Sequence, residues 1–338
     1  MKRHLIALLV VPTLLTYAYR PADACIWDND TLLSEKRRFP HVFDLITGTF
    51  LRHSDDYYRW RITDRTKRIA AKPRAVRLYD DLAVAYSKLG MNAKAVATML
   101  AKNKIKPGLY ETHANLGTFY MSMGKMKKGL EHIKKAIKIN PKAHFGREVF
   151  QLRLVEYIQH MRPAGMPLNS RRVMKDLSGD GALTRAVRNP RYKRGGFWDF
   201  LKARKHSHKK ALKGVLGMMK FADHRSPALL EVLGDLLLEG RRHRLKDAKR
   251  LAAMAYLKAS FEVKGAAAKK AYVAKAKQAL QGQRLAKFDT LAIRLKGALR
   301  RAGAYFKLIE ANEKRWIKQG RNVDRQFRRK YYRKRRRR

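Results

Sequence analysis

Three prolines, Pro73, Pro107 and Pro141, recur along this sequence at a constant separation of 34 residues. Proline lacks an amide donor and clashes with the preceding helical turn, so each proline marks a point where a helix has to stop. A fixed period of this length indicates repeated supersecondary units, and a chain of 338 residues has room for several of them. The period therefore predicts stacked pairs of helices.

Within each period, small residues, an aromatic residue and a glycine fall at matching positions. In the second period Gly117 would let two antiparallel helices approach, Tyr120 would fill the space between them, and Gly124 suits a left-handed residue at the end of a helix. The matching residues are Leu82, Ala83, Tyr86, Gly90, Ala95, Met99 and Pro107 in the first period and Leu116, Gly117, Tyr120, Gly124, Gly129, Ile133, Ala136 and Pro141 in the second. This pattern resembles the tetratricopeptide repeat.

The resemblance implies an all-α fold, a tetratricopeptide-like α-solenoid of antiparallel helix pairs with additional C-terminal helices. A third, degenerate copy has about six extra residues between its two helices, at 241–246. Its matching residues are Leu233, Gly234 and Leu237 in the first helix and Ala252, Tyr256 and Ala259 in the second. The repeats therefore account for roughly half of the chain.

The remaining segments are assigned from local signals. Ser54 followed by Asp55 and Asp56 predicts the start of a helix that caps the first repeat, and the cluster of prolines and glycines after 161 predicts a break. The predicted segments are a signal peptide at 1–24, N-terminal capping helices at 25–75, the repeats with one following helix at 76–160, an irregular linker or insertion at 161–209, a degenerate repeat-like region at 210–283, a long C-terminal helix at 284–320 and a basic disordered tail at 321–338.

The N-terminus has the three parts of a secretory signal. Lys2 and Arg3 precede an apolar run that ends near residue 19, and Ala-Asp-Ala at 22–24 is an A-x-A cleavage site. About 15 apolar residues would reach only about 22 Å as a helix, less than the hydrocarbon core of a bilayer. We therefore expect export to the periplasm or cell envelope.

Cleavage after residue 24 would make Cys25 the mature N-terminus, the position at which bacterial lipoproteins are lipidated. The residues before Cys25 depart from the usual lipoprotein signal, because Ala22 stands where leucine is common and Asp23 where a small residue is common. Soluble export is the first expectation, and a lipid anchor on Cys25 is the alternative.

The chain carries a formal net charge of +52, and residues 161–338 hold 50 of its 79 lysines and arginines. The tail after Arg321 is the most basic part, with Phe327, Tyr331 and Tyr332 interleaved. Outside the cytoplasm such a region predicts contact with an anionic membrane or polymer surface. The predicted contact residues are Arg328, Arg329, Lys330, Arg333, Lys334 and Arg335. The alternatives are a solvated tail in a generally basic proteome, or a cytoplasmic nucleic-acid-binding protein.

Acidic residues, scarce in this chain, collect at the first-helix positions that line the concave groove of tetratricopeptide arrays. They are Asp80, Glu111, Glu231, Asp235 and Glu239. The last three are spaced i, i+4, i+8, so they share one helical face. The functional interpretation is a groove that accepts a protein or a basic peptide. The alternative is ordinary pairing with the three arginines within 241–244.

No catalytic motif is present, and we expect neither an enzyme nor a cofactor. The chain has one cysteine, which excludes a cysteine-rich zinc site, and it has no phosphate-binding glycine loop. The run that begins Asp176-x-Ser178-x-Asp180 resembles a calcium loop, but Val187 replaces the glutamate at its twelfth position, so no metal site is expected.

The segment C-I-W-D-x-D-T-L that starts at Cys25 and the run H-F-G-R-E that starts at His144 resemble those of uncharacterised tetratricopeptide proteins of the cell envelope. The resemblance and the charge together predict a non-catalytic, exported scaffold for protein–protein interaction, with a basic C-terminal half that contacts an anionic surface.

Overall fold

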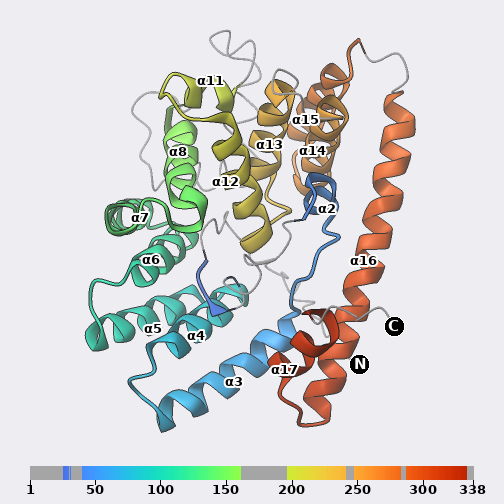
Figure 1. Ribbon diagram of the computed structural model, residues 1–338. Coiled ribbons are helices and arrows are strands. Elements are labelled where there is room, and N and C mark those ends of the chain that lie inside the picture. The colour runs from blue at the N-terminus through green and yellow to red at the C-terminus, as the bar shows by residue number, and fades with distance from the viewer. Residues whose placement is uncertain are drawn as a thin grey trace, which may run out of the picture.

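The computed structural model describes residues 26–29, 31, 40–160, 196–240, 247–282 and 287–332. The predicted signal peptide, Cys25 and the tail residues Arg333, Lys334 and Arg335 lie outside these ranges. Within them the chain forms helices and turns and has no strand, as an all-α solenoid requires (Figure 1).

The two predicted repeats are present as two helical hairpins. They consist of α4 (Val76–Lys88), α5 (Asn92–Ile105), α6 (Tyr110–Ser122) and α7 (Met126–Ile139). Gly90 and Gly124 have φ values of 80° and 75°, so they end the first helix of each pair in the left-handed conformation. A Cβ on Gly117 would lie 2.6 Å from Cδ1 of Ile133, which confirms that α6 and α7 need a glycine at their contact.

The array continues beyond the second repeat. Its further elements are the 3-10 turn η1 (Ala143–Gly146), α8 (Arg147–His160), α11 (Phe197–Lys202), α12 (His208–Phe221), α13 (Pro227–Gly240), α14 (Ala248–Glu262) and α15 (Ala266–Ala279). Helices α13 and α14 carry the degenerate third repeat and pack against each other. The described part of the predicted linker, 196–209, is not irregular: Phe197, Phe200 and Leu201 are buried, and burial of these side chains holds α11 in the core.

The N-terminal part does not form one cap as expected for 25–75. Helix α3 (Asp55–Ala71) does cover α4, but α2 (Val42–Thr47) packs against α12, α14 and α16 in the other half of the molecule. Leu45 and Ile46 of α2 are fully buried there. The apolar residues of α2 therefore belong to the large core of the C-terminal half.

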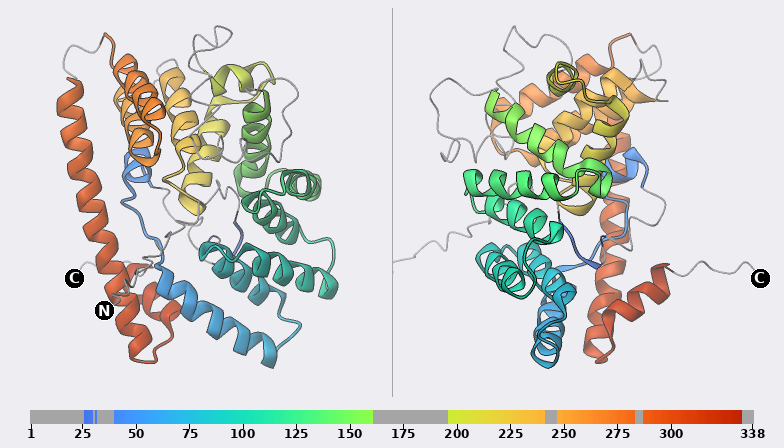
Figure 2. Two further views of the ribbon diagram at one scale, coloured as in Figure 1. Left: turned by 180° about the vertical axis from the view of Figure 1, so that it is seen from behind. Right: turned by 60° about the vertical axis from the view of Figure 1, so that its left-hand side comes forward.

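A 31-residue helix, α16 (Phe288–Lys318), runs from the end of the array back to its beginning, where it contacts α3 (Figures 1 and 2). The chain then turns into α17 (Val323–Phe327) and a π-helical turn at Arg328–Tyr332. The prediction of a disordered tail is therefore wrong for 321–332. Val323 and Phe327 are buried with Tyr57, Ile309 and Trp316, and this apolar contact orders the segment.

Candidate functional site

The face of the repeats that α4 and α6 form is covered by the chain's own residues 26–29. Ile26 is 1% exposed and packs with residues of both first helices. Its cluster includes Tyr79 and Ala83 of α4 and Leu116 and Phe119 of α6. We call this face the repeat groove. It holds residues 26–29 as a peptide would be held.

Asn115 of α6 binds the backbone of this segment at two points. The amide N–H of Trp27 donates to Oδ1 of Asn115 at 2.8 Å, and Nδ2 of Asn115 donates to the carbonyl of Trp27 at 3.0 Å. A side-chain amide offers one acceptor and two donors, so it can satisfy both main-chain groups of one residue. Nearby, the amide N–H of Asn29 donates to Asp81 of α4 at 3.0 Å. These contacts hold main chain and do not depend on the side chains of the segment.

The indole of Trp27 gives the segment its largest side-chain contact. The ring lies edge-on to Tyr110, with centroids 6.0 Å apart, and to His144, with centroids 4.3 Å apart. Edge-to-face packing of this kind is favourable beyond the area that it buries. The carbonyl of Ile26 accepts from Nη2 of Arg147 at 3.4 Å, so α6, η1 and α8 all contribute to the groove.

A buried network of ion pairs continues from the segment into α3. Nη1 of Arg61 binds Asp28 at 2.9 Å and Nη2 of Arg61 binds Asp81 at 2.8 Å, while Nε of Arg65 binds the other oxygen of Asp81 at 2.9 Å. Arg65 also pairs with Asp324 of α17. Burial raises the pKa of Asp324, but Arg61 and Arg65 outweigh it and lower the pKa to about 2. The network thereby joins the segment, α3, α4 and α17.

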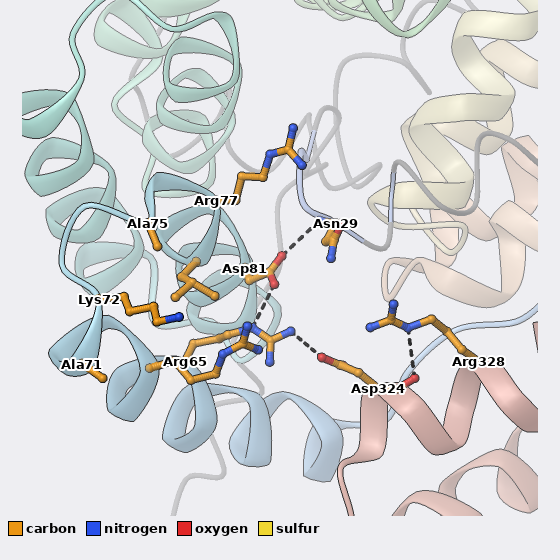
Figure 3. A pocket seen from close by; sticks show the side chains of 11 residues that line it. Asn29, Arg65, Ala71, Lys72, Ala75, Arg77, Asp81, Asp324 and Arg328 are labelled. Carbon is orange, nitrogen blue, oxygen red and sulfur yellow. Dashed lines mark hydrogen bonds and ion pairs between the residues drawn. The ribbon is translucent and has the colours of Figure 1, made fainter.

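Beside this network is a pocket of about 420 Å³ between the end of α3, the start of α4 and α17 (Figure 3). Its charged lining consists of Arg65, Arg68, Lys72, Arg77, Arg328, Asp81 and Asp324. We call this space the basic pocket. Asn29 also lines it, so the pocket adjoins the occupied groove.

Of the acidic residues predicted for the groove, Asp80 lies next to Asn115 and accepts from its Nδ2 at 3.4 Å. Asp80 is 3% exposed, and both its carboxylate oxygens accept from Nζ of Lys102 on α5 at 2.7 Å. Burial is the main reason that the pKa of Asp80 is raised to about 7, although Lys102 acts in the opposite direction. Asp80 therefore joins the two helices of the first repeat and is covered by them. Glu111 is half-buried at the start of α6.

Glu231 and Asp235 are buried in the second half of the molecule. Glu231 accepts from the hydroxyl of Tyr272 at 2.8 Å and pairs with Lys275. Asp235 accepts from the hydroxyl of Tyr256 at 2.6 Å and from the amide of Phe197 at 3.0 Å. Their partners are on α11, α14 and α15, whereas the arginines within 241–244 that the alternative expectation named lie outside the described residues. Glu239 is half-buried at the end of α13.

The described residues of the predicted polyanion site are exposed. Arg328 lines the basic pocket, and Nζ of Lys330 donates to Oδ1 of Asn312 at 2.7 Å. Arg329 is exposed on the same turn. The structure thus gives Arg328 a defined place beside cations of α3 and α4, which the sequence did not indicate.

Sequence analysis missed the groove contacts of Asn115 and Trp27 and the pocket cations Lys72 and Arg77. Asn115 had one available signal, since this amide directly precedes Leu116 and Gly117, two matching residues of the repeat. The pocket had none, because its lining combines Asn29, residues 65–81 and the C-terminal Asp324 and Arg328, which are far apart in the sequence.

Comparison with known proteins supports the predicted tetratricopeptide repeat. The family model described as Tetratricopeptide repeat matches residues 110–143, which span α6 and α7. No curated protein matches the chain. In the ranges that the structure describes, no group of three potential metal ligands occurs, and every helix is too short or too polar to cross a bilayer.

Proposed function

We propose that this chain, in which residues 110–143 match the tetratricopeptide repeat, is a non-catalytic scaffold that binds an extended segment of another protein in the repeat groove. The observation that supports this proposal most directly is that Asn115 makes hydrogen bonds with both main-chain groups of Trp27. Recognition of main chain by a fixed amide suits an extended peptide, because it leaves each side chain free to enter its own pocket.

The bound segment indicates what such a peptide should look like. It places an aliphatic residue, Ile26, in an apolar site, an aromatic residue, Trp27, against two rings, and an acidic residue, Asp28, on Arg61. A partner peptide with an aliphatic, an aromatic and an acidic residue in succession would make the same contacts. It would bind in place of residues 26–31, which act as a tethered occupant.

Export to the periplasm or cell envelope is part of the proposal and is supported by the pattern of the first 24 residues. Either Cys25 is a free mature N-terminus or it carries a lipid. The basic half would hold the protein to an anionic membrane or polymer, an idea supported by the 50 basic residues at 161–338. Among the described tail residues, Arg328, Arg329 and Lys330 are exposed for such contact.

To test the groove, a fluorescein-labelled peptide of the sequence Ile-Trp-Asp-Asn-Asp-Thr is titrated with the full chain. Fluorescence anisotropy measures the affinity. Trp27→Ala weakens the tethered occupant, so this variant should bind the peptide about tenfold or more tightly than the wild type. Adding Asn115→Ala should remove that gain. Trp60→Ala, a half-buried tryptophan on α3, is the matched control and should leave the affinity unchanged. Equal binding of a scrambled peptide would contradict the proposal.

Location is tested by fractionating the native cells and measuring the mass of the N-terminus. A chain that starts at Cys25, with or without a lipid, supports export. An uncleaved cytoplasmic chain with nucleic-acid affinity that falls steeply with salt would replace this part of the proposal with the nucleic-acid alternative.

A further inference from the structure

We propose that the basic pocket between α3, α4 and α17 is a binding site for a phosphate group. Figure 3 shows Arg65 from α3, Arg77 from α4 and Arg328 from the turn after α17 around one space. Its volume of about 420 Å³ is larger than a phosphate ion requires, so a phosphate group on a small organic body also fits.

The charges that line this pocket are unbalanced. Five cationic side chains face two carboxylates, and both carboxylates are already bound by the protein. Asp81 accepts from Arg61, Arg65 and the amide of Asn29. Asp324 accepts from Arg65 and, at 2.8 Å, from the hydroxyl of Tyr57. These carboxylates hold Arg65 in place and form no ion pair with the other four cations of the lining.

The remaining cations have few partners. Lys72 and Arg77 make no ion pair with any residue in the described parts of the chain, and Arg68 has only Asp64, 3.5 Å away. Arg328 donates through Nε to the main-chain oxygen of Asp324 at 3.3 Å, which leaves its two terminal nitrogens for a ligand. A divalent oxyanion would compensate these charges, and the planar guanidinium groups match the oxygens of phosphate.

The backbone at the start of α4 also favours an anion in the pocket. Helix α4 starts at Val76 beside the pocket, and its N-cap, Ala75, gives no side-chain cap, although the amides of Val76 and Leu78 donate to the carbonyls of Arg74 and Ala75. The positive end of this 13-residue helix therefore adds to the field of the arginines.

The phosphate group could belong to a soluble molecule or to a lipid headgroup, since the pocket opens to solvent and would contact the same oxygens in either case. This inference goes beyond the proposed peptide binding. It does not use Asn115 or Trp27, so peptide binding and phosphate binding can fail separately.

The test uses isothermal titration of the full chain with pyrophosphate and with inorganic phosphate at low salt. The wild type should bind about one pyrophosphate per chain. Lys72→Gln combined with Arg77→Gln should weaken binding about tenfold or more, because charge-assisted hydrogen bonds to phosphate are lost. The matched control combines Lys67→Gln with Arg74→Gln, which removes the same charge from exposed positions outside the pocket lining and should change the affinity less than about twofold.

Cosedimentation with vesicles of phosphatidylcholine and phosphatidic acid distinguishes the two sources. Vesicle binding that the Lys72/Arg77 variant loses and the control variant keeps assigns the site to lipid headgroups. If the chain binds pyrophosphate but the Lys72/Arg77 variant binds the vesicles as well as the wild type does, the site is assigned to soluble phosphates. Equal weakening of pyrophosphate binding in the two double variants, or no saturable pyrophosphate binding by the wild type, would overturn the inference.

Discussion

The Glu313 carboxylate of α16 accepts a hydrogen bond from the backbone amide of Ser54, 2.9 Å away, although the two residues are 259 positions apart. Its other oxygen lies 2.6 Å from Nδ1 of His53. Ser54 is also the N-cap of α3, so one residue both starts that helix and binds α16. Because the side chain of Glu313 is completely buried, this contact fixes the C-terminal helix to the first helix of the repeat array.

Glu313→Ala should lower the free energy of unfolding by about 2–4 kcal/mol, because it leaves the buried amide of Ser54 and the ring of His53 without their acceptor. Urea denaturation measures this change. Glu310→Ala on the same helix is the control and should cost less than about 0.5 kcal/mol, because its side chain is 35% exposed and its ion pair with Lys314 is weak. Similar effects of the two substitutions would show that α16 is not fixed through Glu313.

Asp324→Asn should change how stability depends on pH. The pKa of Asp324 is lowered to about 2 in the folded protein, so its stabilising effect is complete above its unfolded pKa near 4 and is lost as the pH falls towards 2. The variant should be less stable than the wild type by about 2 kcal/mol at pH 7. This difference should shrink between pH 4 and pH 2.

Urea unfolding at several pH values measures that difference, with Asp56→Asn as the control on the surface of α3. A gap between wild type and Asp324→Asn that stays constant down to pH 2 would contradict a charged, arginine-bound Asp324.

Lys275→Met should destabilise the C-terminal half strongly. Lys275 pairs with Glu231 and lies 3.6 Å from Asp235, and its removal leaves two buried carboxylates side by side. The expected cost is about 3–5 kcal/mol at pH 8, decreasing at pH 5 because a protonated carboxylate no longer requires the cation. Thermal unfolding checks this result. Lys269→Met, at an exposed position of the same helix, should have little effect, and an equally small effect of Lys275→Met would refute the structural role of Lys275.

Two glycine substitutions should act in opposite directions. Gly117→Ala should cost about 1–3 kcal/mol, because the new Cβ would overlap the fully buried Ile133 and would lie 3.1 Å from the main-chain oxygen of Gly129. Gly303→Ala lies in the middle of α16 with no atom within 4 Å of the new Cβ, so it should stabilise the protein by up to about 1 kcal/mol through helix propensity. Denaturation midpoints measure both. A stabilising Gly117→Ala would contradict the close packing of α6 on α7.

Local features of the sequence were sufficient to predict the repeats. Gly90 and Gly124 end helices in the predicted left-handed conformation, and Tyr86 and Tyr120 pack against the core of the repeats as expected. These features could be predicted because each involves residues within one 34-residue period. Within that period, helical spacing alone decides which side chains meet.

The partners of the polar side chains could not be predicted in this way. Asp80 and Glu231 have the spacing of groove residues, yet they bind partners on neighbouring helices. The position of a residue along a helix does not determine which neighbouring helix its side chain will contact. The tail at 321–332 has the composition of a disordered segment, but Asp324 binds Arg65, and Phe327 is 2% exposed among aromatic residues of α3 and α16.

The sequence by itself therefore determined the period, the helix pairs and the strongly basic character of this protein. Only the tertiary structure decided that Ile26 and Trp27 fill the repeat groove, that α16 returns to α3 and that Lys72, Arg77 and Arg328 meet in one pocket. The physical reason is distance along the chain. Helical hairpins form through contacts between near neighbours, whereas the groove joins residues 52 to 121 positions apart and the pocket includes Arg65 and Asp324, which are 259 positions apart.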